Sequence, residues 1–297
     1  MKVQGGFAAA YNIDTGQQLW RFFVNPPAGG DKDWAIREAN KGWIQGMKTS
    51  DILAKCRACL EDDWGKAGKD GSQSGPGWGQ WAIDEETGII YLGTAQPSPD
   101  WNATYRPGPN LYANAVVALD AKTGELKWYH QTTTHDLWDW DCSWSSVLGA
   151  IGTRKVLYKG CKNGILYAFD ARTGEIIWYF NAPTIRRSDW TPFHASSLLG
   201  SGPKDNGPMG AWDPSDIKTM TRRWQNDPST GPRWQNPPGT GGIESDIALA
   251  YGNVYVGTYN LPGYGRSVPV EIDKPPTSGN MGVPAPYSQR PKPQSTP

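Results

Sequence analysis

Three carboxylates stand within six residues in the segment 134–142, which reads Thr-His-Asp-Leu-Trp-Asp-Trp-Asp-Cys. If the segment is extended, the side chains of Asp139 and Asp141 point to the same face. Neighbouring carboxylates repel one another unless a cation or a proton lies between them, and a hard metal ion with oxygen ligands meets that need. The segment therefore predicts a metal or proton-transfer site, with an acidic loop capped by aromatic side chains as the alternative.

Two other segments carry side chains suited to binding a flat, polar ligand. Trp78 is flanked by Gly77 and Gly79, and glycines on both sides let a planar molecule approach the indole face. The alternative for Trp78 is a side chain that packs between strands. Lys162 precedes an Asn-Gly pair at 163–164, which is typical of a hairpin turn. Lys162 either binds an anionic group or is a solvated charge beside that turn.

The cysteines do not form a recognisable metal motif. Cys56 and Cys59 make a single Cys-x-x-Cys pair, and Leu60 stands where attached haem would need a histidine. A zinc site of this type needs a second such pair, which the sequence lacks. We expect a local disulfide or two ordinary thiols at 56 and 59; the other cysteines are Cys142 and Cys161.

These residues are set in a repeat. The pattern Ala-x-Asp-x-x-Thr-Gly-x-x-x-Trp occurs at 118–128 and 168–178, with an Asn variant at 10–20. Each copy has an apolar run, then a turn in which Asp or Thr bonds the backbone and Gly takes a positive φ, then a run ending in Trp. Each copy therefore predicts a β-hairpin, and similar hairpins are expected at 81–93 and 248–257.

Four-stranded units at a period of about 50 residues are typical of β-propeller blades. We therefore expect an all-β protein with about five or six blades or part-blades, in which Trp side chains pack between neighbouring blades. Short helical pieces are expected at 33–38 and 50–55. The expected organisation is a partial propeller domain at 1–282, with an insertion at 31–75 and a long loop region at 183–240, then a Pro-rich loop or tail at 283–297.

Composition excludes several classes of protein. Lys plus Arg and Asp plus Glu both number 29 in the 297 residues, so no basic excess exists to bind nucleic acid. The mean hydropathy is −0.61, and no apolar run approaches the roughly 20 residues of a membrane span. The 36 Gly and 25 Pro disfavour a helical protein, and the 16 Trp and 13 Tyr disfavour disorder. The first residues lack the apolar region of a signal peptide.

Taken together, these motifs resemble the pyrroloquinoline quinone (PQQ)-dependent alcohol and methanol dehydrogenases, which are eight-bladed propellers. The Trp-containing repeat is that family's docking motif, and the Asp-Trp-Asp segment is the most specific part of the resemblance. The next most specific is 93–108, which contains Gly-Thr-Ala-Gln-Pro-Ser-Pro-Asp-Trp-Asn and Arg-Pro-Gly. The resemblance runs from about residue 3 to 182 and is weaker through about 270.

The resemblance implies a bound Ca²⁺ or lanthanide ion. Asp139 falls on the proposed catalytic base, which also faces the metal, and Asp141 falls on the additional acid of the lanthanide-dependent branch. The family places an Asn ligand where this chain has Gln96, whose amide oxygen reaches one methylene further. The implied metal ligands are therefore Gln96, Asp139 and Asp141. The family's glutamate ligand would fall at about Met1, so the chain reads as an internal segment that is inactive alone.

The resemblance also implies a quinone and a substrate pocket. Trp78 falls on the tryptophan that stacks against PQQ, Lys162 on the basic residue that bonds the quinone oxygens, and Trp101 on an aromatic wall of the substrate pocket. The implied reaction is oxidation of a small primary alcohol by hydride transfer, with a cytochrome c as electron acceptor. Family members work in the periplasm or outside the cell, and a homodimer is compatible with the resemblance.

A non-catalytic propeller is the alternative, such as a scaffold of the outer-membrane assembly lipoprotein type. A scaffold keeps the docked hairpins but has no need of the Asp-Trp-Asp and Gly-Trp-Gly segments. Geometry separates the two hypotheses. In the enzyme, the carboxylates of Asp139 and Asp141, the Gln96 amide and the Trp78 ring converge on one pocket. In the scaffold they are scattered.

Overall fold

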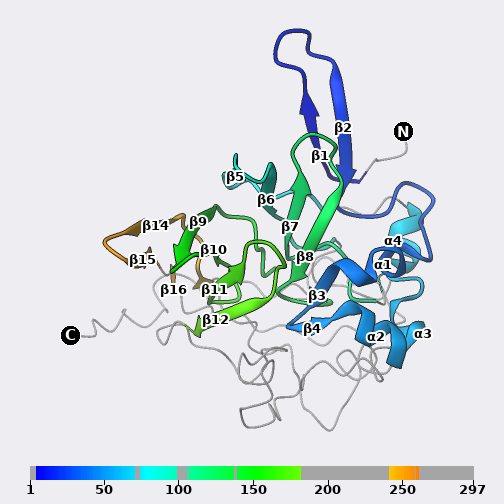
Figure 1. The fold of residues 1–297 in the computed structure, drawn as a ribbon. Helices are drawn as coiled ribbons and strands as arrows, with labels where there is room; N and C mark the ends of the chain where they lie inside the picture. Colours follow the sequence, from blue (N-terminus) through cyan, green and yellow to red (C-terminus); the bar gives the residue numbers. More distant parts are fainter. Residues whose placement is uncertain are drawn as a thin grey trace, which may run out of the picture.

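The computed structural model describes most of the first 181 residues and a short stretch near residue 250 (Figure 1). The predictions for Trp101, for 183–240 and for 283–297 lie outside the described residues. The described residues are 5–70, 74–98, 106, 108–136, 139–181, 241–257 and 259–260.

Two antiparallel sheets of four consecutive strands form the centre of the described structure, as expected for propeller blades (Figure 1). In each sheet, every strand pairs with the next one along the chain. The first blade consists of β5 (Ala82–Asp84), β6 (Ile89–Gly93), β7 (Ala115–Asp120) and β8 (Leu126–Gln131). The second consists of β9 (Ser146–Ile151), β10 (Arg154–Gly160), β11 (Ile165–Asp170) and β12 (Ile176–Asn181).

Further hairpins flank the two blades and confirm the repeat-based predictions. β1 (Phe7–Tyr11) pairs with β2 (Gln18–Phe23), and this hairpin projects from the rest of the chain in Figure 1. On the other side, β14 (Ile247–Ala250) pairs with β15 (Asn253–Val256). A short ladder joins β13 (Gly241–Gly242) to β16 (Tyr259–Asn260).

Helices occur between β2 and β5, where short helical pieces were predicted. β3 pairs in parallel with β8, so this region adds two strands to the first blade. None of the described helices is long and apolar enough to cross a membrane. The elements are α1 (Trp34–Arg37), a 3₁₀ turn (Ala39–Lys41), β3 (Gly42–Ile44), β4 (Met47–Lys48), α2 (Thr49–Lys55), α3 (Arg57–Leu60) and α4 (Gly65–Asp70).

The hydrophobic core covers both faces of the first blade, as the side chains of β7 show. Side chains alternate across a strand, so its odd and even residues enter different clusters. Ala115, Val117 and Leu119 pack with the helical region and the first hairpin. Val116 and Ala118 pack with the second blade. Because both faces of β7 are buried, its first five residues are all apolar instead of alternating with polar residues.

The repeated tryptophans connect neighbouring hairpins, as predicted. The indole N–H of Trp20 donates to the carbonyl of Ala121 at 3.0 Å, and that of Trp128 donates to the carbonyl of Ala171 at 2.9 Å. Each tryptophan is buried. The Trp that ends one repeat thus docks on the turn of the next, which adds buried apolar area and satisfies the indole donor at once.

We expect the Thr-Gly turn to tolerate substitution only where no tryptophan docks on it. Gly16 and Gly174 occupy equivalent turns, with φ of 68° and 72°, so an alanine strains both backbones equally. A Cβ at Gly174 would overlap the Trp128 ring, whereas one at Gly16 meets nothing within 4 Å. Gly174→Ala should therefore lower the free energy of unfolding by about 1–3 kcal/mol more than Gly16→Ala. Denaturant unfolding of the two variants tests this, and equal losses would contradict the docking geometry.

Stability should fall below pH 6.5 because of His130 in β8. Its Nδ1–H donates to the Gly174 carbonyl at 2.6 Å, and its Nε2 accepts the Gly46 N–H at 3.1 Å, so the folded protein holds a neutral ring. Burial lowers the pKa of His130 to about 4, although the Gly174 carbonyl opposes this. Between pH 6.5 and 4 the unfolded chain therefore binds a proton at His130 that the folded chain does not bind, and acid favours unfolding.

The expected loss from His130 is about 3 kcal/mol between pH 6.5 and 4. Unfolding by urea at a series of pH values measures it, with His130→Gln as the comparison because glutamine does not titrate. The wild-type protein should lose more stability over this range than the variant. Parallel pH profiles would show that His130 does not titrate differently in the two states.

Candidate functional site

The two predicted carboxylates face the predicted lysine. The Lys162 ammonium lies 2.7 Å from an Asp139 carboxylate oxygen and 3.6 Å from one of Asp141. The extended conformation considered for this segment does not occur: residues 139–142 form no strand, and Asp139 has a φ of 64°. Aspartate tolerates this left-handed conformation better than most residues. Both carboxylates therefore face Lys162 from a segment with a left-handed residue at Asp139, and not from one face of a strand.

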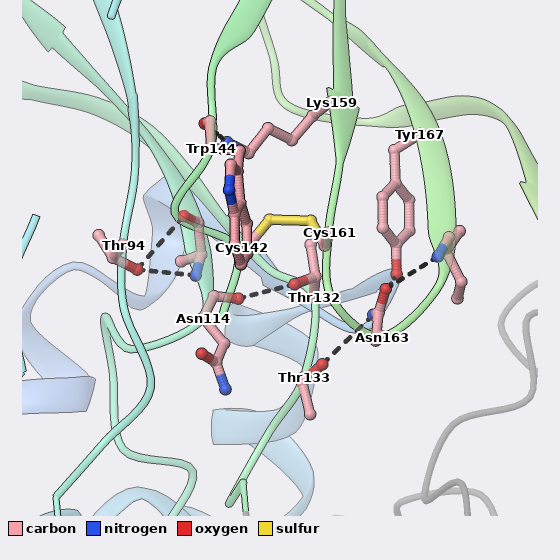
Figure 2. Close-up of a disulfide and its surroundings, with 12 residues drawn as sticks. Thr94, Asn114, Thr132, Thr133, Cys142, Trp144, Lys159, Cys161, Asn163 and Tyr167 are labelled. Carbon is pink, nitrogen blue, oxygen red and sulfur yellow. Dashed lines mark hydrogen bonds between the residues drawn. A yellow bond between two sulfur atoms is a disulfide. The ribbon is translucent and has the colours of Figure 1, made fainter. Parts of the chain in front are cut away.

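Lys162 is placed by the predicted turn between β10 and β11. The Gly164 N–H donates to the Cys161 carbonyl at 2.9 Å, which confirms a turn at Asn163-Gly164. The Asn163 amide donates to the hydroxyl of Tyr167 at 2.9 Å and fixes the turn from inside (Figure 2). The Lys162 N–H donates to the Asp141 carbonyl at 2.9 Å, so the backbone also joins the turn to the carboxylate segment.

Gln96 joins this cluster from the loop that follows β6. Its backbone N–H donates to the Asp141 carboxylate at 2.9 Å. Its side-chain oxygen Oε1 is buried and has no hydrogen-bond partner within the described part of the chain. A buried amide oxygen without a donor is costly. Gln96 therefore contributes an oxygen that is available to a ligand.

Asp141 is 2% exposed, and its surroundings shift its pKa in opposite directions. Burial raises the pKa of Asp141 to about 7, and the Asp139 charge adds to the rise, against the Gln96 N–H and the Lys162 charge. Burial alone would lower the pKa of Lys162, but hydrogen bonding to Asp139 and the charges of Asp139, Asp141 and Glu244 raise it. The Lys162 ammonium therefore interacts with three carboxylates at once, those of Asp139, Asp141 and Glu244.

This donor set fits a hard cation. Two carboxylates and one unpartnered amide oxygen are the ligands that calcium and lanthanide ions prefer. A cation there would offset the burial cost of Asp141. The set is small, because no group of three or more His, Cys, Asp or Glu able to hold a metal occurs among the residues that the structure describes.

Trp78 lies on the adjoining loop and is 64% exposed, so its indole is available to a ligand. Its ring meets Trp144 edge to face at 5.6 Å. Its flanking glycines have a packing role that the sequence did not indicate. A Cβ at Gly77 or Gly79 would overlap the backbone of the segment 143–145, so these glycines allow the Trp78 loop to pack on that segment.

The other polar residues of the Asp-Trp-Asp motif hold the backbone. The carboxylate of Asp136 accepts the amide of Asn114 at 2.7 Å and the Trp140 N–H at 2.8 Å. His135 is buried, its Nδ1 lies 2.8 Å from the Gly108 carbonyl, and burial lowers its pKa to about 3. The third carboxylate and the histidine of the motif therefore position the loop.

Sequence analysis missed two features of the site. Glu244 comes from the stretch after β13, where one of its carboxylate oxygens is buried, and its charge raises the pKa of Lys162. No local motif marked it. The second is a disulfide between Cys142 and Cys161, 19 residues apart in the chain. The Cys56–Cys59 pair forms the expected local disulfide.

Part of the chain is similar to known dehydrogenases that use PQQ. Residues 54–197 match the family model described as "PQQ: Glucose/ethanol/alcohol dehydrogenase, beta-propeller domain". Methanol dehydrogenase (cytochrome c) subunit 1 of Methylobacterium organophilum is 35% identical over 175 residues, 54% of this chain and 25% of that subunit. Quinohemoprotein alcohol dehydrogenase ADH IIB of Pseudomonas putida is 34% identical over 171 residues, 54% of this chain and 22% of that enzyme.

The chain spans about a quarter of the length of these relatives. Among solved structures, the quinohemoprotein alcohol dehydrogenase of Comamonas testosteroni is 28% identical with a TM-score of 0.46, covering 70% of this chain and 30% of that one.

Proposed function

We propose that this chain forms part of the active site of an enzyme that oxidises a small primary alcohol with PQQ and a bound Ca²⁺ or lanthanide ion. Residues 54–197 match the PQQ-dependent dehydrogenase propeller domain, and the similar proteins are methanol and quinohemoprotein alcohol dehydrogenases. One observation carries the proposal: the carboxylates of Asp139 and Asp141 both face the Lys162 ammonium, and the Gln96 backbone N–H reaches Asp141 from a separate loop. A scaffold has no use for this costly arrangement of buried charge.

The roles of the residues follow from their chemistry. Gln96, Asp139 and Asp141 would hold the cation, and Trp78 would lie against the PQQ ring plane. When bound, the cation and PQQ supply Lewis acidity and a two-electron acceptor. Trp101 falls outside the described residues, and its place in the substrate pocket is part of the proposal.

Asp139 is proposed as the base that accepts the hydroxyl proton of the alcohol. Its carboxylate is partly exposed and held by the Lys162 ammonium at 2.7 Å, so it is both oriented and reachable from solvent. Lys162 is positioned to stabilise negative charge that develops on the quinone oxygens. The hydrogen bond to Asp139 and the surrounding acids raise the Lys162 pKa against its burial, which favours the charged form that this role needs.

We also propose an electron acceptor and a location for the protein, by analogy with its relatives. The printed name of one relative includes cytochrome c, and we propose a cytochrome c as electron acceptor here. A periplasmic or extracellular location and a homodimer are proposed on the family resemblance. A non-catalytic scaffold remains the competing function, but it leaves the Gln96 oxygen and the Asp141 carboxylate without a purpose.

The test is alcohol-dependent reduction of a dye by the natural full-length protein, after addition of PQQ with Ca²⁺ or La³⁺. We expect turnover that requires both the quinone and one of the metals. The 297-residue chain alone should show none, because its match covers only 25% of the methanol dehydrogenase subunit. No turnover by the full-length protein with either metal and several primary alcohols would remove the enzyme proposal.

A further inference from the structure

We propose that the Cys142–Cys161 disulfide positions the candidate site by holding the carboxylate segment and the lysine turn at one fixed separation. The inference rests on the function proposed above. It concerns two residues that have no part in the chemistry. We call this disulfide the site cross-link.

The site cross-link sits directly beside the reactive groups. Cys142 follows Asp141 in the chain, and Cys161 precedes Lys162. The two Cα atoms lie 4.4 Å apart, and both side chains are fully buried in the core between the two blades (Figure 2). The cross-link therefore restrains the backbone on both sides of the contact between Asp141 and Lys162.

The site cross-link also reaches the other parts of the site. The Cys142 N–H donates to the Thr94 carbonyl at 3.2 Å, two residues before Gln96. One residue further along, the Ser143 carbonyl accepts the Gly79 N–H at 2.9 Å, next to Trp78. Three loops that carry proposed ligand contacts thus meet at the residues around Cys142.

The local backbone explains why a covalent bond matters here. Residues 139–145 form no strand, so separate hydrogen bonds to several loops hold their backbone instead of a continuous ladder. A cross-link removes alternative arrangements of such a segment, and a site that is already in its binding arrangement loses less entropy when the ligand binds. The side-chain nitrogen of the buried Lys159 donates to the Trp144 carbonyl and holds the same segment from the β10 side (Figure 2).

The test is the affinity of the natural full-length protein for PQQ in the presence of Ca²⁺ or La³⁺, measured by equilibrium dialysis and by quenching of tryptophan fluorescence. The test variant is C142A/C161A. The matched control is C56A/C59A, which removes the other disulfide of the chain, outside the candidate site. Circular dichroism at the temperature of the assay establishes that each protein is folded.

Loss of the site cross-link should weaken PQQ binding by about 10-fold or more, as for other supporting contacts of a site, and the control should bind as the wild type does. In a Lys162→Gln background the same two substitutions should cost clearly less, because the cross-link acts through Lys162. A cross-link that only stabilised the fold would leave the affinity of a folded variant unchanged.

Equal affinity of folded C142A/C161A and wild type would overturn the inference and leave the proposed function intact. Absence of PQQ binding by the wild type with either metal would overturn both. If C142A/C161A does not fold, wild-type protein reduced with a phosphine replaces it, with free thiols counted by mass spectrometry. Reduced protein that binds PQQ as tightly as oxidised protein would then overturn the inference.

Discussion

Replacing Asp139 by Asn should reduce alcohol-dependent dye reduction by about 10²–10⁴-fold in the natural full-length protein loaded with PQQ and metal. The substitution keeps the size of the side chain but removes its negative charge and its ability to accept a proton. It also replaces the 2.7 Å ion pair with Lys162 by a contact to an uncharged amide. The loss should appear in kcat as well as in kcat/KM, because the base acts in the transition state.

The matched control is Asp14→Asn in the exposed turn of the first hairpin, which makes the same chemical change far from the site in sequence. Its steady-state rates should equal those of the wild type. If Asp139→Asn keeps more than about one tenth of the wild-type kcat, Asp139 is not the base and another group must accept the proton.

Replacing Trp128 by Ala should lower the free energy of unfolding by about 3–5 kcal/mol. Trp128 is 2% exposed and packs against Tyr91 and Phe169 of the two blades it joins. Its removal leaves a cavity between the blades and deprives the buried Ala171 carbonyl of its donor. Urea unfolding followed by circular dichroism measures the change.

Two variants separate the contributions to this loss. Trp128→Phe keeps most of the apolar volume and should cost about 1 kcal/mol for the missing hydrogen bond, plus any repacking. Trp78→Ala removes an equally large but mostly exposed side chain and should change stability by less than about 1 kcal/mol. Equal losses for Trp128→Ala and Trp78→Ala would contradict the docking role of the repeated tryptophan.

The hairpins could be predicted because their signals are local. The Thr-Gly turn and the terminal Trp recur with a fixed spacing. In the structure, the copies that end at Trp20 and Trp128 each form a hairpin, and each of these indoles docks on a later turn. Turn chemistry and strand pattern depend on a few neighbouring residues, so sequence is enough to identify them.

The candidate site depends on tertiary structure and was only partly predictable. The Asp-Trp-Asp segment identified Asp139 and Asp141, but its backbone is not extended, since Asp139 adopts a left-handed conformation. No spacing rule indicated that Cys142 would pair with Cys161, because that pairing needs two loops from different strands to meet. The glycines beside Trp78 fit a close backbone approach as well as they fit a ligand, and sequence alone does not separate the two.

The most direct test of the account is a crystal structure of the natural full-length protein soaked with PQQ and a lanthanide ion, with the ion located by anomalous scattering. The account predicts one ion bound by oxygens of Gln96, Asp139 and Asp141, with the quinone between that ion and the Trp78 ring and within hydrogen-bond distance of Lys162. An ion bound elsewhere, or a quinone that touches neither Trp78 nor Lys162, would contradict it.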